Sequence, residues 1–195
     1  MTRESFPERV RAILRQHTPR TVAEWEARPA AVLVPLFLKD GRWHLLFTQR
    51  TETVQDHKGQ ISFPGGRRDP DDPSLLATAL REAQEEIGLD PADVTILGQL
   101  DEMYTVTQYR ISPFVGVIPY PYPFRVNSAE IAELIEAPLE AFLDPANLEQ
   151  RERAALVGPP VPVYFYHIGP YTIWGVTARI VKDFLERIAP ALKGT

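Results

Sequence analysis

The feature that most constrains this chain is a short segment in which acidic and apolar residues recur at helical spacing. The segment is Arg81-Glu-Ala-Gln-Glu-Glu-Ile-Gly-Leu89. At about 100° of rotation per residue, Glu85 and Glu86 lie about 60° and about 40° from Glu82, one on each side. The apolar residues fall on a separate arc, which we expect to be buried; they are Leu76, Leu80, Ala83 and Ile87. The pattern predicts an amphipathic helix with three glutamates on one face.

Three carboxylates at this spacing repel one another and destabilise a helix unless a positive charge gathers them. A hard divalent cation, which prefers carboxylate oxygens, is one candidate. Taken alone, an acidic stripe of this kind is usually a solvated helix face. In either case we expect Glu86 to be an exposed acid whose replacement leaves folding intact.

Size and composition favour one globular domain covering residues 1–195, because 195 residues with 44% hydrophobic content can form a single core. A net charge of −5 argues against a broad nucleic-acid surface. The absence of cysteine excludes disulfides, thiol nucleophiles and thiolate metal sites. The longest apolar stretch, Ala30 to Leu38, contains Pro35 and is too short to cross a bilayer. We therefore expect a cytoplasmic protein with no membrane or nucleic-acid partner.

The order of the expected elements mixes strands and helices, which favours an α/β (α+β) sandwich. An N-terminal region of about residues 1–28 should pack a helix, ending near Thr18, on the domain. An Asp40-Gly41 turn should join the first two strands. Expected strands cover 30–38, 43–49, 94–101, 111–118, 162–168 and 171–174. Expected helices cover 129–135, 138–143, 176–188 and the glutamate helix, with Asp72 as its N-cap, Pro73 as its first residue and Gly88 just past its end.

Several familiar catalytic motifs are absent, including phosphate-loop, dinucleotide-binding, zinc-protease and nucleophile-elbow patterns. The stretch from Gly65 to Leu89, by contrast, closely resembles the Nudix box. Its second half, Arg81-Glu82-x-x-Glu85-Glu86-x-Gly88, matches position by position. The first half departs from the usual pattern, because Asp72 replaces a glutamate and one extra residue precedes Arg81. This departure favours a capping role for Asp72 over a metal-binding one.

A second motif lies upstream of the box. Leu46-Phe-Thr-Gln-Arg50 and His57-Lys-Gly-Gln-Ile-Ser-Phe-Pro-Gly-Gly66 resemble the signature of coenzyme A-type Nudix hydrolases, except that Gln55 stands where an arginine is usual. The resemblance implies an α/β/α Nudix sandwich with a central mixed sheet. It also implies hydrolysis of coenzyme A or acyl-coenzyme A to 3′,5′-ADP and 4′-phosphopantetheine. The alternatives are another nucleoside diphosphate derivative (ADP-ribose, NADH, a dinucleoside polyphosphate or a nucleoside triphosphate), or an inactive Nudix-like binding module.

The same resemblance implies roles for individual residues. A Mg²⁺ or Mn²⁺ ion would bind Glu82, Glu85, Glu86 and the carbonyl of Gly66, and Arg81 would support the glutamates by pairing with Glu85. The general base stays open between a box glutamate such as Glu85 and an acid on a later segment. The later candidates are Glu102, Glu130 and Glu133, of which we select Glu130. Arg50, His57, Gln60 and Arg67 are the expected substrate-binding residues.

Overall fold

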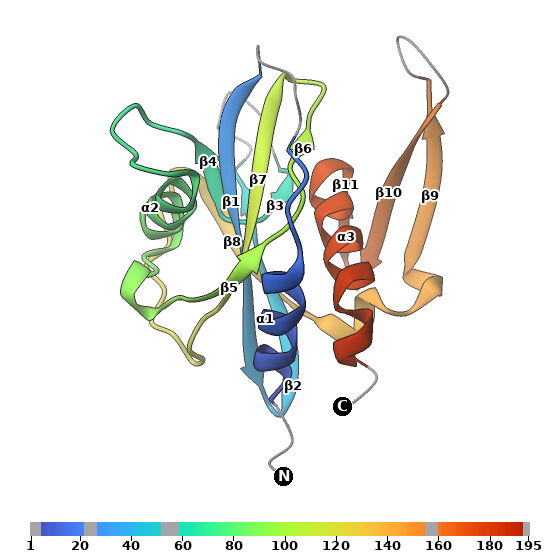
Figure 1. Cartoon of the computed structure of the whole chain (residues 1–195), viewed down its shortest axis with the longest axis horizontal. Helices are drawn as coiled ribbons and strands as arrows, with labels where there is room; N and C mark the ends of the chain where they lie inside the picture. Colours follow the sequence, from blue (N-terminus) through green and yellow to red (C-terminus); the bar gives the residue numbers. More distant parts are fainter. Residues whose placement is uncertain (1–4, 22–26, 52–58, 155–159, 193–195) are drawn as a thin grey trace.

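The computed structural model describes residues 5–21, 27–51, 59–154 and 160–192. It has a large central mixed sheet with helices on both faces, which confirms the expected mixed α+β architecture (Figure 1). The main path of the sheet is β3-β2-β1-β7-β5, while β4 pairs with β1, β6 with β7 and β8 with β2. The strands are β1 (Arg28–Lys39), β2 (Arg42–Arg50), β3 (Ile61–Ser62), β4 (Gly65–Arg67), β5 (Thr95–Gln99), β6 (Met103–Tyr104), β7 (Tyr109–Val117) and β8 (Ile131–Pro138).

The β1–β2 hairpin confirms the expected Asp-Gly turn, in which both residues adopt positive φ angles of 50° and 75°. Near this turn β1 pairs with β2 over Leu36–Lys39. Further along, the two strands take different partners. β1 pairs with β4 across Ala30 to Val32, and β2 pairs with β3 and β8. This divergence brings Gly65 and Gly66 into the sheet, where they face the glutamate helix.

Helix α2 (Leu75–Ile87) covers one face of the sheet, and α1 (Phe6–Gln16) and α3 (Gly175–Leu192) cover the other (Figure 1). Each face has its own apolar cluster. Phe6, Val10 and Leu14 bury the inner side of α1 in the larger cluster, which confirms that a helix of the N-terminal region packs on the domain. None of the helices in the described part of the chain is long and apolar enough to cross a membrane.

Asp101 connects the segment after α1 to α3. Its carboxylate accepts hydrogen bonds from Arg20 Nε and Arg187 Nη2, both at 2.6 Å, and it lies 2.8 Å from His17 Nε2. Burial alone would raise the pKa of Asp101, but the bonds from Arg20 and the Arg187 charge hold it below its usual value. The N-terminal segment is therefore fastened by charge as well as by apolar packing.

A second sheet of three strands lies beyond α3 (Figure 1). Its strands are β9 (Leu148–Arg153), β10 (Val161–Ile168) and β11 (Tyr171–Trp174). The β10–β11 hairpin confirms the sequence expectation. Strand β9 was not expected, because four of its six residues are charged and only its pairing with β10 defines it as a strand.

Two sequence expectations about local structure are wrong. The segment 129–135 is not a helix, since Ile131–Pro138 forms β8 and pairs with β2. Helix α2 starts at Leu75 with Ser74 as its N-cap, so Asp72 and Pro73 precede it. Short 3-10 turns also occur, including the expected one after Pro138; they are η1 (Pro91–Asp93), η2 (Leu139–Phe142) and η3 (Pro145–Asn147).

Candidate active site

Helix α2 is fixed at both ends by residues suited to those positions. Ser74 Oγ accepts a hydrogen bond from the Ala77 amide at 3.1 Å. Gly88 ends the helix with φ 69°, a conformation that glycine adopts without strain, and confirms the expected C-terminal position. Ala83 and Ile87 are fully buried against the sheet, whereas Leu76 and Leu80 are only half-buried. The buried face is thus rotated from the predicted stripe, since Thr78, Ala79 and Glu86 are buried in place of Leu76 and Leu80.

Asp72 and Arg81 form a clamp that joins the loop before α2 to the helix itself. Arg81 donates from Nε to Asp72 Oδ1 and from Nη2 to Asp72 Oδ2, both at 3.0 Å. Thr78 Oγ1 and the Asp69 amide also donate to Asp72 Oδ2, each at 2.9 Å. The Arg81 hydrogen bonds hold the pKa of Asp72 well below its usual range. Asp72 therefore orients Arg81 and does not cap the helix.

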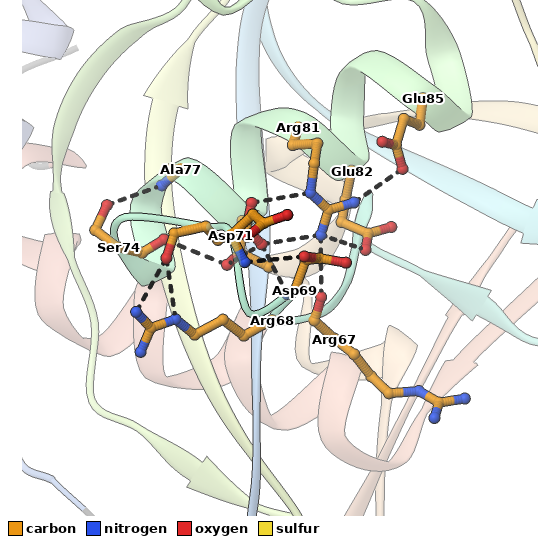
Figure 2. Close-up of polar contacts among 11 residues, drawn as sticks. Arg67, Arg68, Asp69, Asp71, Ser74, Ala77, Arg81, Glu82 and Glu85 are labelled. Atoms are coloured by element: carbon orange, nitrogen blue, oxygen red, sulfur yellow. Dashed lines mark hydrogen bonds and ion pairs between the residues drawn. The ribbon is translucent and has the colours of Figure 1, made fainter.

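Arg81 also contacts two of the three glutamates (Figure 2). Its Nη1 donates to Glu85 Oε2 at 2.9 Å, which confirms the expected i,i+4 pair, and its Nη2 donates to Glu82 Oε1 at 3.0 Å. The Glu85 side chain is 58% exposed. Arg81 Nη2 further donates to the backbone carbonyl of Arg67 at 3.1 Å. One guanidinium group thus positions the loop, Glu82 and Glu85 together.

Glu86 is buried, with 4% exposure, so the expectation of an exposed acid is wrong. Its carboxylate accepts a hydrogen bond from the Gly65 amide at 3.2 Å. Burial, reinforced by the neighbouring Glu82 and Glu130 charges, raises the pKa of Glu86 to about 8, although Gly65 and Arg50 oppose the rise. The fold therefore holds a carboxylate where little compensates its negative charge.

Glu82 and Gly66 approach each other closely. A Cβ atom at position 66 would lie 2.5 Å from Glu82 Cδ, so any larger residue would displace the Glu82 carboxylate. Burial raises the pKa of Glu82, and Arg81 opposes the rise. The backbone at Gly66 thus lies against a half-buried carboxylate, as close backbone approach at the glycine pair predicts.

Arg50 lies between Glu86 and a second acid, Glu130. Arg50 Nη1 is 3.7 Å from Glu86 Oε1, and Arg50 Nη2 is 3.9 Å from Glu130 Oε2. Both separations exceed ordinary hydrogen-bond length. Arg50 Nε is buried without a hydrogen-bond partner among the residues described. The guanidinium group consequently neutralises Glu86 only in part.

Asn127 fixes the position of Glu130 relative to α2. The Asn127 amide donates to the Glu86 carbonyl at 2.9 Å, and its side-chain Nδ2 donates to Glu130 Oε1 at 3.3 Å. The Arg125 amide likewise bonds the Ile87 carbonyl at 2.9 Å. Sequence reasoning missed Asn127, because no motif marks it and its role depends on contacts between distant segments.

Of the other expected site residues, Gln60 lies beside Arg50, whereas the side chains of Glu102, Glu133 and Arg67 make contacts or point elsewhere. The Gln60 carbonyl accepts the Arg50 amide hydrogen bond at 3.0 Å, which places Gln60 beside Arg50. The Glu102 carboxylate accepts a hydrogen bond from Ser112 Oγ at 2.9 Å, and the Glu133 carboxylate accepts one from Tyr171 Oη at 2.7 Å. The Arg67 side chain points away from Glu82 and Glu85 (Figure 2). His57 and Gln55 lie outside the described residues.

The acidic residues fit a hard cation in their chemistry. Glu82 and Glu86 provide carboxylate oxygens whose charge the protein compensates poorly, and Gly66 leaves space beside them. Among the described residues, no three histidines or acids are grouped closely enough to hold a metal ion. Arg81 pairs with both Glu82 and Glu85, but Glu85 is the exposed one of the two. Glu82 and Glu86 therefore lie beside the consecutive glycines Gly66 and Gly65, whereas Glu85 is exposed.

Comparison with known proteins agrees with this geometry. The NUDIX domain model matches residues 27–156. The chain is also 38% identical over 161 residues to an uncharacterized Nudix hydrolase, NudL, of Photorhabdus laumondii, covering 83% of this chain and 85% of that protein. The chain belongs to the Nudix family. It is a hydrolase of phosphoric anhydride bonds in diphosphate-bearing substrates, and Nudix hydrolases generally use divalent metal ions.

A further relative supports the same assignment, and two solved structures show the same fold. A Yersinia pestis NudL is 36% identical over 162 residues, covering 83% of this chain and 80% of that protein. The MutT protein of Methanosarcina mazei has a TM-score of 0.55 at 21% identity, covering 88% of this chain and 99% of that chain. A MutT/nudix family protein of Enterococcus faecalis has a TM-score of 0.56 at 16% identity, covering 97% of this chain and 76% of that chain. These structures confirm that the fold of this Nudix hydrolase is the family's fold.

The raised pKa of Glu86 predicts a pH-dependent stability in the metal-free enzyme. Between pH 4.5 and about 8 the folded state retains a proton on Glu86 that the unfolded state releases, so stability should fall as pH rises through this window. Asp72 acts in the opposite direction, but only below its unfolded pKa of 3.8. Urea unfolding in the presence of a chelator would measure the slope.

The Glu86→Gln variant should lose most of this slope, because its side chain cannot ionise, and the raised pKa of Glu82 accounts for the remainder. Glu85→Gln is the matched control, since it removes the same charge from an exposed position. A slope that persists unchanged in Glu86→Gln, or disappears in Glu85→Gln, would contradict the burial of Glu86.

Proposed function

We propose that this Nudix hydrolase cleaves the diphosphate bond of coenzyme A and its acyl derivatives, releasing 3′,5′-ADP and 4′-phosphopantetheine. The observation that carries the proposal is the position of Arg50. This residue belongs to the upstream motif that resembles the coenzyme A-type signature, and its guanidinium lies between Glu86 and Glu130. Gln60, from the same motif, lies beside it. The two motifs thus contribute to one site.

Glu82 and Glu86 would hold Mg²⁺ or Mn²⁺ together with the Gly66 carbonyl, and Glu85 would complete the set after releasing Arg81. A bound divalent ion neutralises diphosphate oxygens and lowers the pKa of coordinated water. Arg81, fixed by Asp72, orients Glu82 for this task. Arg50 supplies positive charge to the substrate phosphates.

Glu130 is the proposed general base. In the reaction, water oxygen forms a bond to one phosphorus, the bridging P–O bond breaks, and the water proton passes to the Glu130 carboxylate. The Asn127 side chain holds that carboxylate at 3.3 Å, beside the half of the site formed by Glu86. The other acids from later segments, Glu102 and Glu133, already have hydrogen-bond partners elsewhere.

A substrate panel tests the proposed function. Coenzyme A, ADP-ribose, NADH, diadenosine tetraphosphate and a nucleoside triphosphate would be assayed with Mg²⁺ and with Mn²⁺, and the products identified by mass spectrometry. We expect the highest kcat/KM for coenzyme A, with 3′,5′-ADP as a product. A kcat/KM for ADP-ribose equal to or above that for coenzyme A would reject the assignment.

Replacing the general base should slow the chemical step more than it weakens substrate binding. We expect Glu130→Gln to lower kcat by about 10²–10³ with little change in KM, because a positioned base contributes on that scale. Asn127→Ala should lower kcat by a smaller factor and add little to the loss in Glu130→Gln, since both act on one group. Glu133→Gln is the matched control on the same segment. Near-normal turnover in Glu130→Gln would remove Glu130 from the mechanism.

A further inference from the structure

Arg28, Arg67 and Tyr109 form a positively charged cluster at one end of the central sheet. The guanidinium carbons of Arg28 and Arg67 lie 5.5 and 5.9 Å from the centroid of the Tyr109 ring. Arg28 is paired with Tyr109 between β1 and β7, and Ala30 is paired with Arg67 between β1 and β4. Because alternate residues of a strand share a face, the three side chains project from the same face.

Among the described residues, neither arginine of this cluster has an acidic partner. Both side chains are exposed, and no carboxylate in the described parts of the chain forms an ion pair with them. Other arginines, such as Arg81 and Arg187, are engaged by carboxylates. The Tyr109 ring attracts both cations but does not neutralise them. An anion shared by the two guanidinium groups would relieve their mutual repulsion.

The cluster lies close to the proposed catalytic site. Arg67 follows Gly66, whose backbone lies against Glu82. Consecutive strand residues point to opposite faces, so Arg67 and the Gly66–Glu82 contact lie on the two sides of β4. Strand β4 pairs with β1 and with no other strand of the described residues, and it ends at Arg67. The outer edge of β4 contacts the acidic site directly, because the Gly65 amide donates to Glu86 and the Arg67 carbonyl accepts a hydrogen bond from Arg81. The cluster and the acidic residues therefore meet at the Arg67 end of β4.

We propose that Arg28 and Arg67 form a subsite for a second phosphate group of the substrate, separate from the diphosphate that is cleaved. In coenzyme A this group is the 3′-phosphate of the ribose, an identification that rests on the proposed function. The subsite distinguishes substrates that carry a phosphate monoester near the adenosine from those, such as ADP-ribose, that lack it. Arg50 and the acidic residues act on the diphosphate.

Calorimetric binding of two nucleotides tests the subsite without requiring turnover. 3′,5′-ADP and 5′-AMP differ only in the 3′-phosphate. The wild-type enzyme should bind 3′,5′-ADP about tenfold or more tightly than 5′-AMP, the scale of a charge-assisted contact. The double variant Arg28→Gln/Arg67→Gln should lose this difference and bind 5′-AMP as the wild type does. Arg153→Gln, an exposed arginine on β9, is the matched control and should keep the difference.

Equal affinity of the wild-type enzyme for the two nucleotides, or no binding of 3′,5′-ADP at millimolar concentration, would overturn the subsite. Preserved discrimination in the double variant would do the same. The hydrolysis of coenzyme A and of its 3′-dephospho form, measured in parallel, separates the two proposals. Discrimination that depends on both arginines, in an enzyme that cleaves neither compound, would support the subsite and reject the proposed function.

Discussion

The burial of the Glu86 carboxylate is the constraint on which the site depends. An ionised acid at 4% exposure is costly unless a positive charge accompanies it. Here a single backbone hydrogen bond and an arginine at 3.7 Å provide partial compensation, and the nearby acids oppose it. We propose that this cost is offset when the same carboxylate binds a divalent cation.

The polar contacts around Glu86 divide into two sets that come from different parts of the chain. On one side, the Asp72–Arg81 clamp fixes the loop before α2 and orients Glu82. On the other, Asn127 ties the segment before β8 to the end of α2. Both sets consist of hydrogen bonds between groups that other parts of the fold hold in place, and neither depends on a mobile surface charge. The acids are thereby positioned before substrate arrives, which is the condition for electrostatic catalysis.

Much of this architecture could be predicted from local sequence. The Asp-Gly hairpin, the α2 periodicity and the β10–β11 hairpin are signals contained within a few neighbouring residues. The start of α2 and strand β8 were mispredicted, because distant partners decide both. Asp72 is drawn to Arg81 and does not cap the helix, and β8 is a strand because β2 pairs with it.

The site itself was only partly predictable. Helical spacing placed three glutamates on one face, but it could not show that Glu86 is buried while Glu85 is exposed. That difference arises from β4, which lies over one side of the helix and donates the Gly65 amide. Asn127 and the Arg28–Tyr109–Arg67 cluster have no sequence signal, since segments distant in the sequence meet to form each environment.

The central claim is that Glu82 and Glu86, whose negative charges the protein compensates only in part, bind a divalent cation. Anomalous scattering from a crystal soaked in Mn²⁺ tests it most directly. The account predicts an anomalous peak in contact with carboxylate oxygens of both glutamates, and no such peak in crystals of the Glu86→Gln variant. A peak bound elsewhere in the wild-type enzyme, with none at Glu82 and Glu86, would contradict the account.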